Sequence, residues 1–157
     1  VGFAVGNNNH DEAKAICKHS VNLGLLIAIV TAALTLIFKQ QIASIYTTDT
    51  VVVELAASLM FLASLFQFSD AIQVISAGAL RGYKDTKSIL IITFVSYWGV
   101  GLSIGLILGL TDWVIQPIGA SGFWIGFISG LSTAAVFLAW RLKVVQRRYD
   151  MQLFSKT

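Results

Sequence analysis

Four long runs of apolar residues, almost free of charged side chains, constrain the fold of this chain more than any other feature. A helix needs about 20 apolar residues to cross the hydrocarbon core of a bilayer, and soluble helices seldom sustain so long an apolar stretch. Asp70 is the only charged residue inside these runs. The sequence therefore predicts an all-α integral membrane protein with four transmembrane helices, at residues of about 20–38, 55–80, 88–111 and 113–140.

The overall composition agrees with a membrane protein and argues against other classes. Hydrophobic residues make up 56% of the chain and charged residues 12%, whereas about 25% of the residues in an ordinary soluble domain are charged. The single cysteine, Cys17, excludes an internal disulfide and a cysteine-rich metal site. The sequence has no phosphate-binding glycine loop, zinc-ligand spacing or nucleophile elbow, so we expect neither an enzyme nor a bound cofactor.

Basic residues are distributed very unevenly over the two ends of the predicted helices. Ten of the eleven Lys and Arg residues fall on the side that holds the N-terminal segment, the 81–87 loop and the 141–157 tail, and only Lys39 falls on the other side. Cytoplasmic loops of membrane proteins are enriched in Lys and Arg, so we expect the N-terminal end and the C-terminal tail to be cytoplasmic. Membrane topology thus accounts for the net charge of +3, and we expect no nucleic-acid partner.

Asp70 is the candidate functional residue, because a charge at membrane depth costs several kcal/mol unless it finds partners or water. Gln67, Ser69 and Gln73 fall on the same half of the helix by their spacing and are candidates for lining a cavity beside it. We interpret Asp70 as a site for a proton or a cation such as Na⁺. The alternative is a structural carboxylate that is hydrogen-bonded to a neighbouring helix.

Glycines repeat every four residues on the third and fourth predicted helices, which indicates close packing of their backbones. The aromatic residues near the helix ends, including Tyr97, are interpreted as anchors at the membrane interface. His10 is expected to be solvated or interfacial. The repeated glycines are Gly101, Gly105 and Gly109 on one helix and Gly122, Gly126 and Gly130 on the other.

The stretch from Phe66 to Thr86, FQFSDAIQVISAGALRGYKDT, resembles the MATE (multidrug and toxic compound extrusion) transporters, most closely their NorM-type branch. Weaker similarities at residues 1–6, 42–49, 97–99 and 119–126 extend this resemblance over essentially the whole chain.

The resemblance implies a fold of twelve helices in two six-helix lobes around a central cavity. Residues 1–157 would form part of the C-terminal lobe, namely the end of the eighth helix and the last four helices. Asp70 matches an acidic residue of the tenth helix that belongs to a cation site in the NorM-type branch. The acidic partner on the seventh helix and the N-terminal lobe would lie in the remaining eight helices. The first residue is not Met, and we expect the chain to be part of a longer protein.

The function implied by the resemblance is a cation-coupled antiporter that exports drug-like organic cations across the bacterial cytoplasmic (inner) membrane by alternating access. The coupling ion would be Na⁺ or H⁺, and the partners would be the organic cations, the lipid bilayer and the rest of the chain. Two alternatives are a flippase for a lipid-linked precursor, from the same superfamily, and a structural membrane subunit that does not transport.

Overall fold

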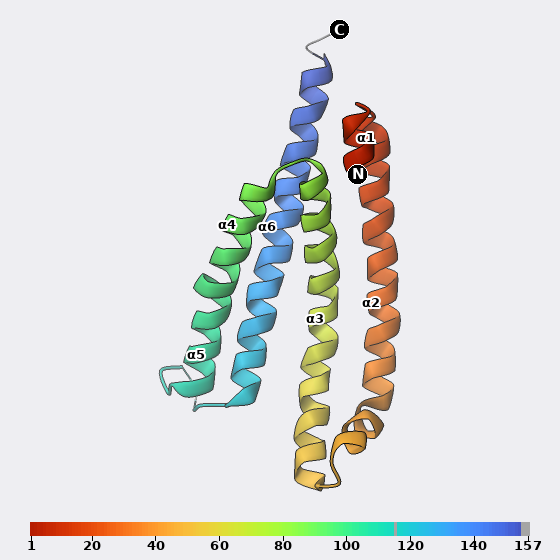
Figure 1. The fold of residues 1–157 in the computed structure, drawn as a ribbon. Coiled ribbons are helices and arrows are strands. Elements are labelled where there is room, and N and C mark those ends of the chain that lie inside the picture. Colours follow the sequence, from red (N-terminus) through yellow and green to blue (C-terminus); the bar gives the residue numbers. More distant parts are fainter. Residues whose placement is uncertain (115, 155–157) are drawn as a thin grey trace.

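The computed structural model describes residues 1–114 and 116–154, and the regular elements in this part of the chain are all helical (Figure 1). The three segments α4, η1 and α5 follow one another without a break, and η1 is a π-helix within that rod. The elements are α1 (Gly2–Gly6), α2 (His10–Tyr46), α3 (Thr50–Gly82), α4 (Thr86–Phe94), η1 (Val95–Leu102), α5 (Ser103–Leu110) and α6 (Ala120–Phe154).

Four of the helical rods are long and apolar enough to cross a membrane, which confirms the predicted fold class. They are α2, α3, the continuous rod Thr86–Leu110 and the Ala120–Met151 part of α6. Many large apolar side chains on these rods are exposed, including Leu26 and Ile27 on α2 and Phe61 on α3. Such surfaces fit lipid or further helices and would be unfavourable in water.

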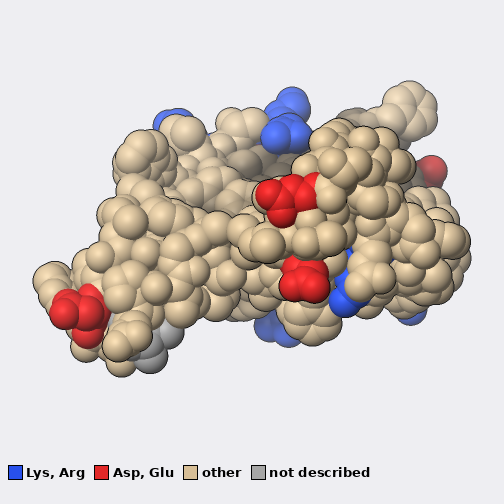
Figure 2. All heavy atoms as spheres, turned by 90° about the horizontal axis from the view of Figure 1, so that it is seen from below, with Lys and Arg blue, Asp and Glu red and all other residues tan. Residues whose placement is uncertain are grey.

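The rods lie side by side, with α3 between α2 and α6, and with the α4–η1–α5 rod packed along α6 (Figure 1). Both ends of the chain lie at the end of the bundle that also carries the α3–α4 connection. The opposite end carries the α2–α3 and α5–α6 connections, and its surface is mostly uncharged (Figure 2). An even number of crossings accounts for this placement of the two termini.

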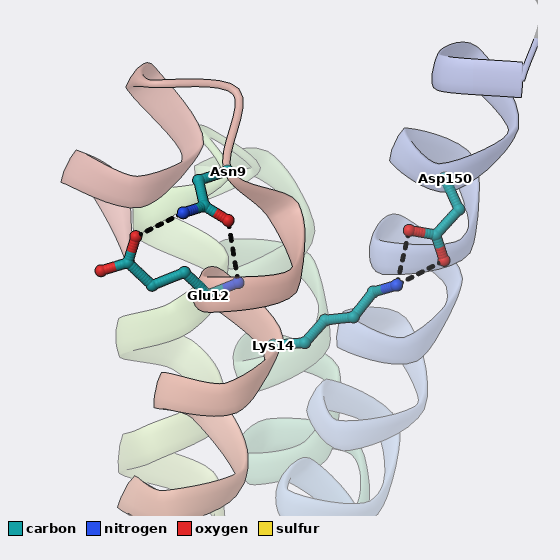
Figure 3. A network of polar contacts seen from close by, with 4 residues as sticks. All are labelled: Asn9, Glu12, Lys14 and Asp150. Carbon is teal, nitrogen blue, oxygen red and sulfur yellow. Dashed lines mark hydrogen bonds and ion pairs between the residues drawn. The ribbon is translucent and has the colours of Figure 1, made fainter.

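The first residues of α2 and α3 are fixed by polar caps. The Asn9 side chain accepts a hydrogen bond from the backbone N–H of Glu12 at 3.2 Å and donates one to the Glu12 carboxylate at 2.8 Å (Figure 3). Asp49 accepts from the backbone N–H of Val51 at 2.9 Å. These bonds satisfy N–H groups that have no partner inside a helix, so both helices begin at defined residues.

The fourth rod differs from the sequence-based boundaries at both ends. Helix α6 begins at Ala120 and not at residue 113, because Pro117 has no N–H to donate and Gly119 adopts a φ of +57°. At the other end α6 continues to Phe154. The expected tail at 141–157 is therefore a helical extension as far as residue 154, and residues 155–157 lie outside the described part.

The glycine repeats lie at a direct backbone contact, as the sequence predicts. A Cβ atom added to Gly122 would lie 2.5 Å from the backbone nitrogen of Gly109, and one added to Gly130 would lie 2.9 Å from the Cα of Gly101. Side chains larger than hydrogen do not fit there, so these positions set the close approach of α6 to the third rod. We call these six residues the glycine seam: Gly101, Gly105, Gly109, Gly122, Gly126 and Gly130.

Candidate functional site

Asp70 lies within the membrane-length part of α3, and its side chain is half-buried. In the described part of the chain no hydrogen bond or ion pair to Asp70 is found. A carboxylate at this depth is costly without a proton, a cation or hydrogen-bond donors. None of the described residues thus occupies the Asp70 carboxylate.

Tyr97 is the residue that the structure adds to this site. It lies in η1, and its phenol is within interaction range of Gln73 and of the Asp70 carboxylate. Tyr97 is near the middle of the Thr86–Leu110 rod, so its interpretation as an interfacial anchor is wrong.

The π-helical segment is the local feature that presents Tyr97. A π-helix has a wider turn than an α-helix, so it changes which side chains face the neighbouring helices, and such segments often occur at functional sites. Gly99 and Gly101 lie in the same segment, and Gly101 packs against the backbone of α6. The spacing of side chains along an ordinary α-helix does not reveal this geometry.

Gln67 and Ser69 do not meet at one place with Asp70. The Thr31 hydroxyl of α2 donates to the Gln67 Oε1 atom at 2.5 Å. The Ser69 and Ser132 hydroxyls are 2.8 Å apart, which joins α3 to α6. The expected cavity-lining residues therefore divide, with Gln73 beside Asp70 and the other two in contact with separate helices.

An aromatic cluster and a cavity lie next to this polar group. Phe66, Trp124 and Phe127 pack with ring centroids 5.9–6.1 Å apart. The cavity has a volume of about 310 Å³, and its walls include Tyr97, Phe127 and glycines of the seam. The cavity is thus lined by aromatic rings and glycines, and aromatic faces attract organic cations.

Two ion pairs connect the helices at the end of the bundle near the two termini. Arg141 Nε lies 2.7 Å from an Asp85 carboxylate oxygen, and Ser88 donates to the other at 2.8 Å. Burial raises the pKa of Asp85, but the hydrogen bonds from Arg141 and Ser88 outweigh it and hold the pKa below the usual value. The pair between Lys14 and Asp150 joins α2 to α6 in the same way (Figure 3).

His10 differs from its expected solvated position. Its side chain is buried, and its ring lies 5.1 Å from that of Tyr149. Tyr149 belongs to the part of α6 that continues beyond the predicted fourth span, so the burial of His10 by Tyr149 is not predictable from the apolar runs. This end of the bundle consequently contains a packed hydrophobic core.

Four helical rods of membrane length define a polytopic membrane protein. Comparison with known sequences gives the family. The MatE family model matches residues 1–107, and the chain belongs to this family of transporters, which are not enzymes.

Curated relatives cover nearly all of the chain. It is 51% identical over 156 residues to the multidrug resistance protein NorM of Aliivibrio fischeri, and this covers 98% of the chain and 34% of that relative. It is 49% identical over 156 residues to the multidrug resistance protein MdtK of Yersinia enterocolitica, with 99% and 34% covered. The chain thus spans about a third of the length of these relatives.

Proposed function

We propose that this chain is part of a cation-coupled antiporter that exports drug-like organic cations, and that Asp70 carries the coupling ion. The observation that supports this most directly is a membrane-depth carboxylate beside Gln73 and Tyr97 that has no ion-pair partner in the described chain. The names of the NorM and MdtK relatives, both multidrug resistance proteins, point the same way.

The coupling follows from the cost of an unpaired charge in a low-dielectric site. Without a bound cation, Asp70 disfavours any state in which it is shut away from water. A cation that binds one state better than the other shifts the balance between an inward-open and an outward-open form. Entry of a cationic drug then competes with the coupling ion for the same negative potential.

The coupling ion is Na⁺ or H⁺, and the chemistry of the site is compatible with either. A proton needs only the Asp70 carboxylate. Sodium needs several oxygen ligands, of which this chain offers the carboxylate, the Gln73 amide oxygen and the Tyr97 hydroxyl. Further oxygens would come from the remaining eight helices that the family resemblance implies.

The placement in the bilayer is part of the same proposal. The basic residues gather at the end that holds both termini, and this supports a bacterial cytoplasmic membrane with the N-terminal end and the α6 extension in the cytoplasm. Residues 1–157 would then form part of a C-terminal lobe, with the other lobe supplying the rest of the drug path.

The experiment is drug efflux from vesicles that contain the full-length transporter, driven by an imposed Na⁺ or H⁺ gradient. We expect Asp70→Asn to abolish gradient-driven efflux while expression stays intact. Glu54→Gln is the matched control, because it makes the same chemical change on the same helix at an exposed position near its start, and it should retain efflux. Unchanged efflux in Asp70→Asn would contradict the role given to Asp70.

The same variants separate the two alternatives. A flippase would translocate a lipid-linked precursor and would not confer drug efflux in the wild type. A structural subunit would show no ion dependence, and Asp70→Asn would harm assembly instead.

A further inference from the structure

A second groove is bordered by α2, α3 and α6, and Asp70 does not line it. It consists of two adjoining cavities of about 420 Å³ and 290 Å³, which share Ile72, Ala139 and Lys143 in their walls. We call this feature the α2–α6 groove and define it by Lys14, Lys18, Ile72, Ala139, Trp140 and Lys143.

One part of the groove is apolar. Its walls are Ile72 on α3 and Ala135, Val136 and Ala139 on α6. The small alanine side chains leave space beside α6. Besides Lys143 and Trp140, the polar groups that line this part are the Ser69 and Ser132 hydroxyls, which bond to each other. A hydrocarbon chain fits such a surface, whereas an inorganic anion would find no partner there.

The other part is basic. Lys14 and Lys18 of α2 and Lys143 of α6 border it, with neutral hydrogen-bonding groups from Asn22 and Gln146. Lys14 is neutralised by Asp150, 2.5 Å away. Lys18 and Lys143 are exposed and form no ion pair with any described residue, so two positive charges at the groove are left for an external anion.

Trp140 places the junction between the two parts at membrane-interface depth. Its indole is 62% exposed beside Lys143, and tryptophan is enriched where the hydrocarbon core meets the headgroup layer. Basic pockets between membrane helices are suited to anionic lipid headgroups. We propose that the α2–α6 groove binds an anionic phospholipid, with its phosphate at Lys18 and Lys143 and an acyl chain along Ile72 and Ala139.

The test is lipid binding to the full-length transporter, measured by native mass spectrometry with phosphatidylglycerol and phosphatidylcholine of identical acyl chains. The wild type should bind phosphatidylglycerol in preference. The double variant Lys18→Gln/Lys143→Gln should bind it about 30-fold more weakly, because each lysine near an anionic surface contributes a factor of about five. The control Lys39→Gln/Lys84→Gln removes the same charge outside the groove and should bind as the wild type does.

A second variant tests the apolar part without changing charge. Ala139→Phe fills the groove and should lower phosphatidylglycerol binding while the lysines remain. Inorganic phosphate added in excess should not displace the lipid, which distinguishes a lipid site from a free-phosphate site.

Two results would overturn the proposal. One is phosphatidylglycerol binding that is equal in the wild type and the double lysine variant. The other is a lower melting temperature of the Ala139→Phe variant together with unchanged lipid binding. That result would mean that another helix of the protein fills the groove. Neither lipid binding nor the melting temperature depends on drug efflux, so this proposal can fail or hold whatever the efflux result for Asp70→Asn.

Discussion

The two contacts that α6 makes, with the third rod and with α3, are built in different ways. At Gly122, Gly126 and Gly130 the backbone of α6 lies directly against the backbone of the third rod. On the α3 side, a pair of serine hydroxyls and a cluster of aromatic rings fill the interface, and two cavities remain along it. Close backbone packing therefore leaves little freedom at three glycines of α6, whereas side chains set the contact between α6 and α3.

The largest effect is expected where the rigid contact is broken. Gly126→Ala would place a Cβ against the backbone of Gly105 and Gly101, which cannot move aside as a flexible side chain can. We expect a loss of several kcal/mol in stability and little folded protein. The melting temperature and the monodisperse fraction of the full-length protein measure it.

The control for this change is Gly78→Ala on α3. An added Cβ at Gly78 meets no described atom within 4 Å. Because alanine favours helix over glycine by about 1 kcal/mol, this variant should be as stable as the wild type or more so. Equal damage from both variants would show that the seam is not the special contact described above.

A smaller effect is expected at Tyr97, which lies in the third rod. Tyr97→Phe keeps the ring and removes the hydroxyl, which lies near Gln73 and Asp70 and which the proposed site uses as a ligand. One hydrogen bond contributes about 1 kcal/mol, so the half-saturating cation concentration for efflux should rise about fivefold. The maximal efflux rate should change little.

Trp98→Phe is the neighbouring control, because Trp98 is exposed and stacks on Phe94 instead. It should leave the half-saturating concentration unchanged. A Tyr97→Phe variant with the cation dependence of the wild type would remove Tyr97 from the site.

The smallest effect is expected at the charged pair that closes the end of the bundle. Asp85→Asn removes the ion pair with Arg141, which is partly exposed, and should cost about 1 kcal/mol. Since the folded-state pKa of Asp85 is lowered, its contribution is present above the ordinary aspartate pKa and is lost as the pH falls through the folded value.

Melting curves of the full-length protein at neutral and acidic pH check this sign. The wild type and Asp85→Asn should differ at neutral pH and converge in acid. Asp112→Asn, in the exposed connection before α6, should melt like the wild type at both pH values. A difference between wild type and Asp85→Asn that grows in acid would contradict the assignment.

The sequence predicts the four rods well, because a bilayer demands length and low charge and both can be read directly. It fails before Ala120, where the predicted fourth span begins at residue 113 but Pro117 and Gly119 delay the start of the helix. Backbone conformation, and not hydrophobicity, decides that boundary.

The candidate site is predictable only in part. Asp70 is conspicuous because a charge stands alone in an apolar run. Helical spacing places Gln67 and Ser69 on the same half of α3, but that criterion is too coarse to show that they bond to α2 and α6. Tyr97 lies on a different rod from Asp70, so its nearness to Asp70 and Gln73 depends on tertiary packing that spacing along one helix does not show.

The most direct test of the central claim counts the cations displaced when a drug binds. Purified full-length protein is titrated with an organic cation in weakly buffered medium, and released H⁺ and Na⁺ are measured. If Asp70 carries the coupling ion, the wild type releases cations on drug binding and Asp70→Asn releases about one fewer per drug molecule. Equal release from both proteins would contradict the claim that Asp70 is the coupling site.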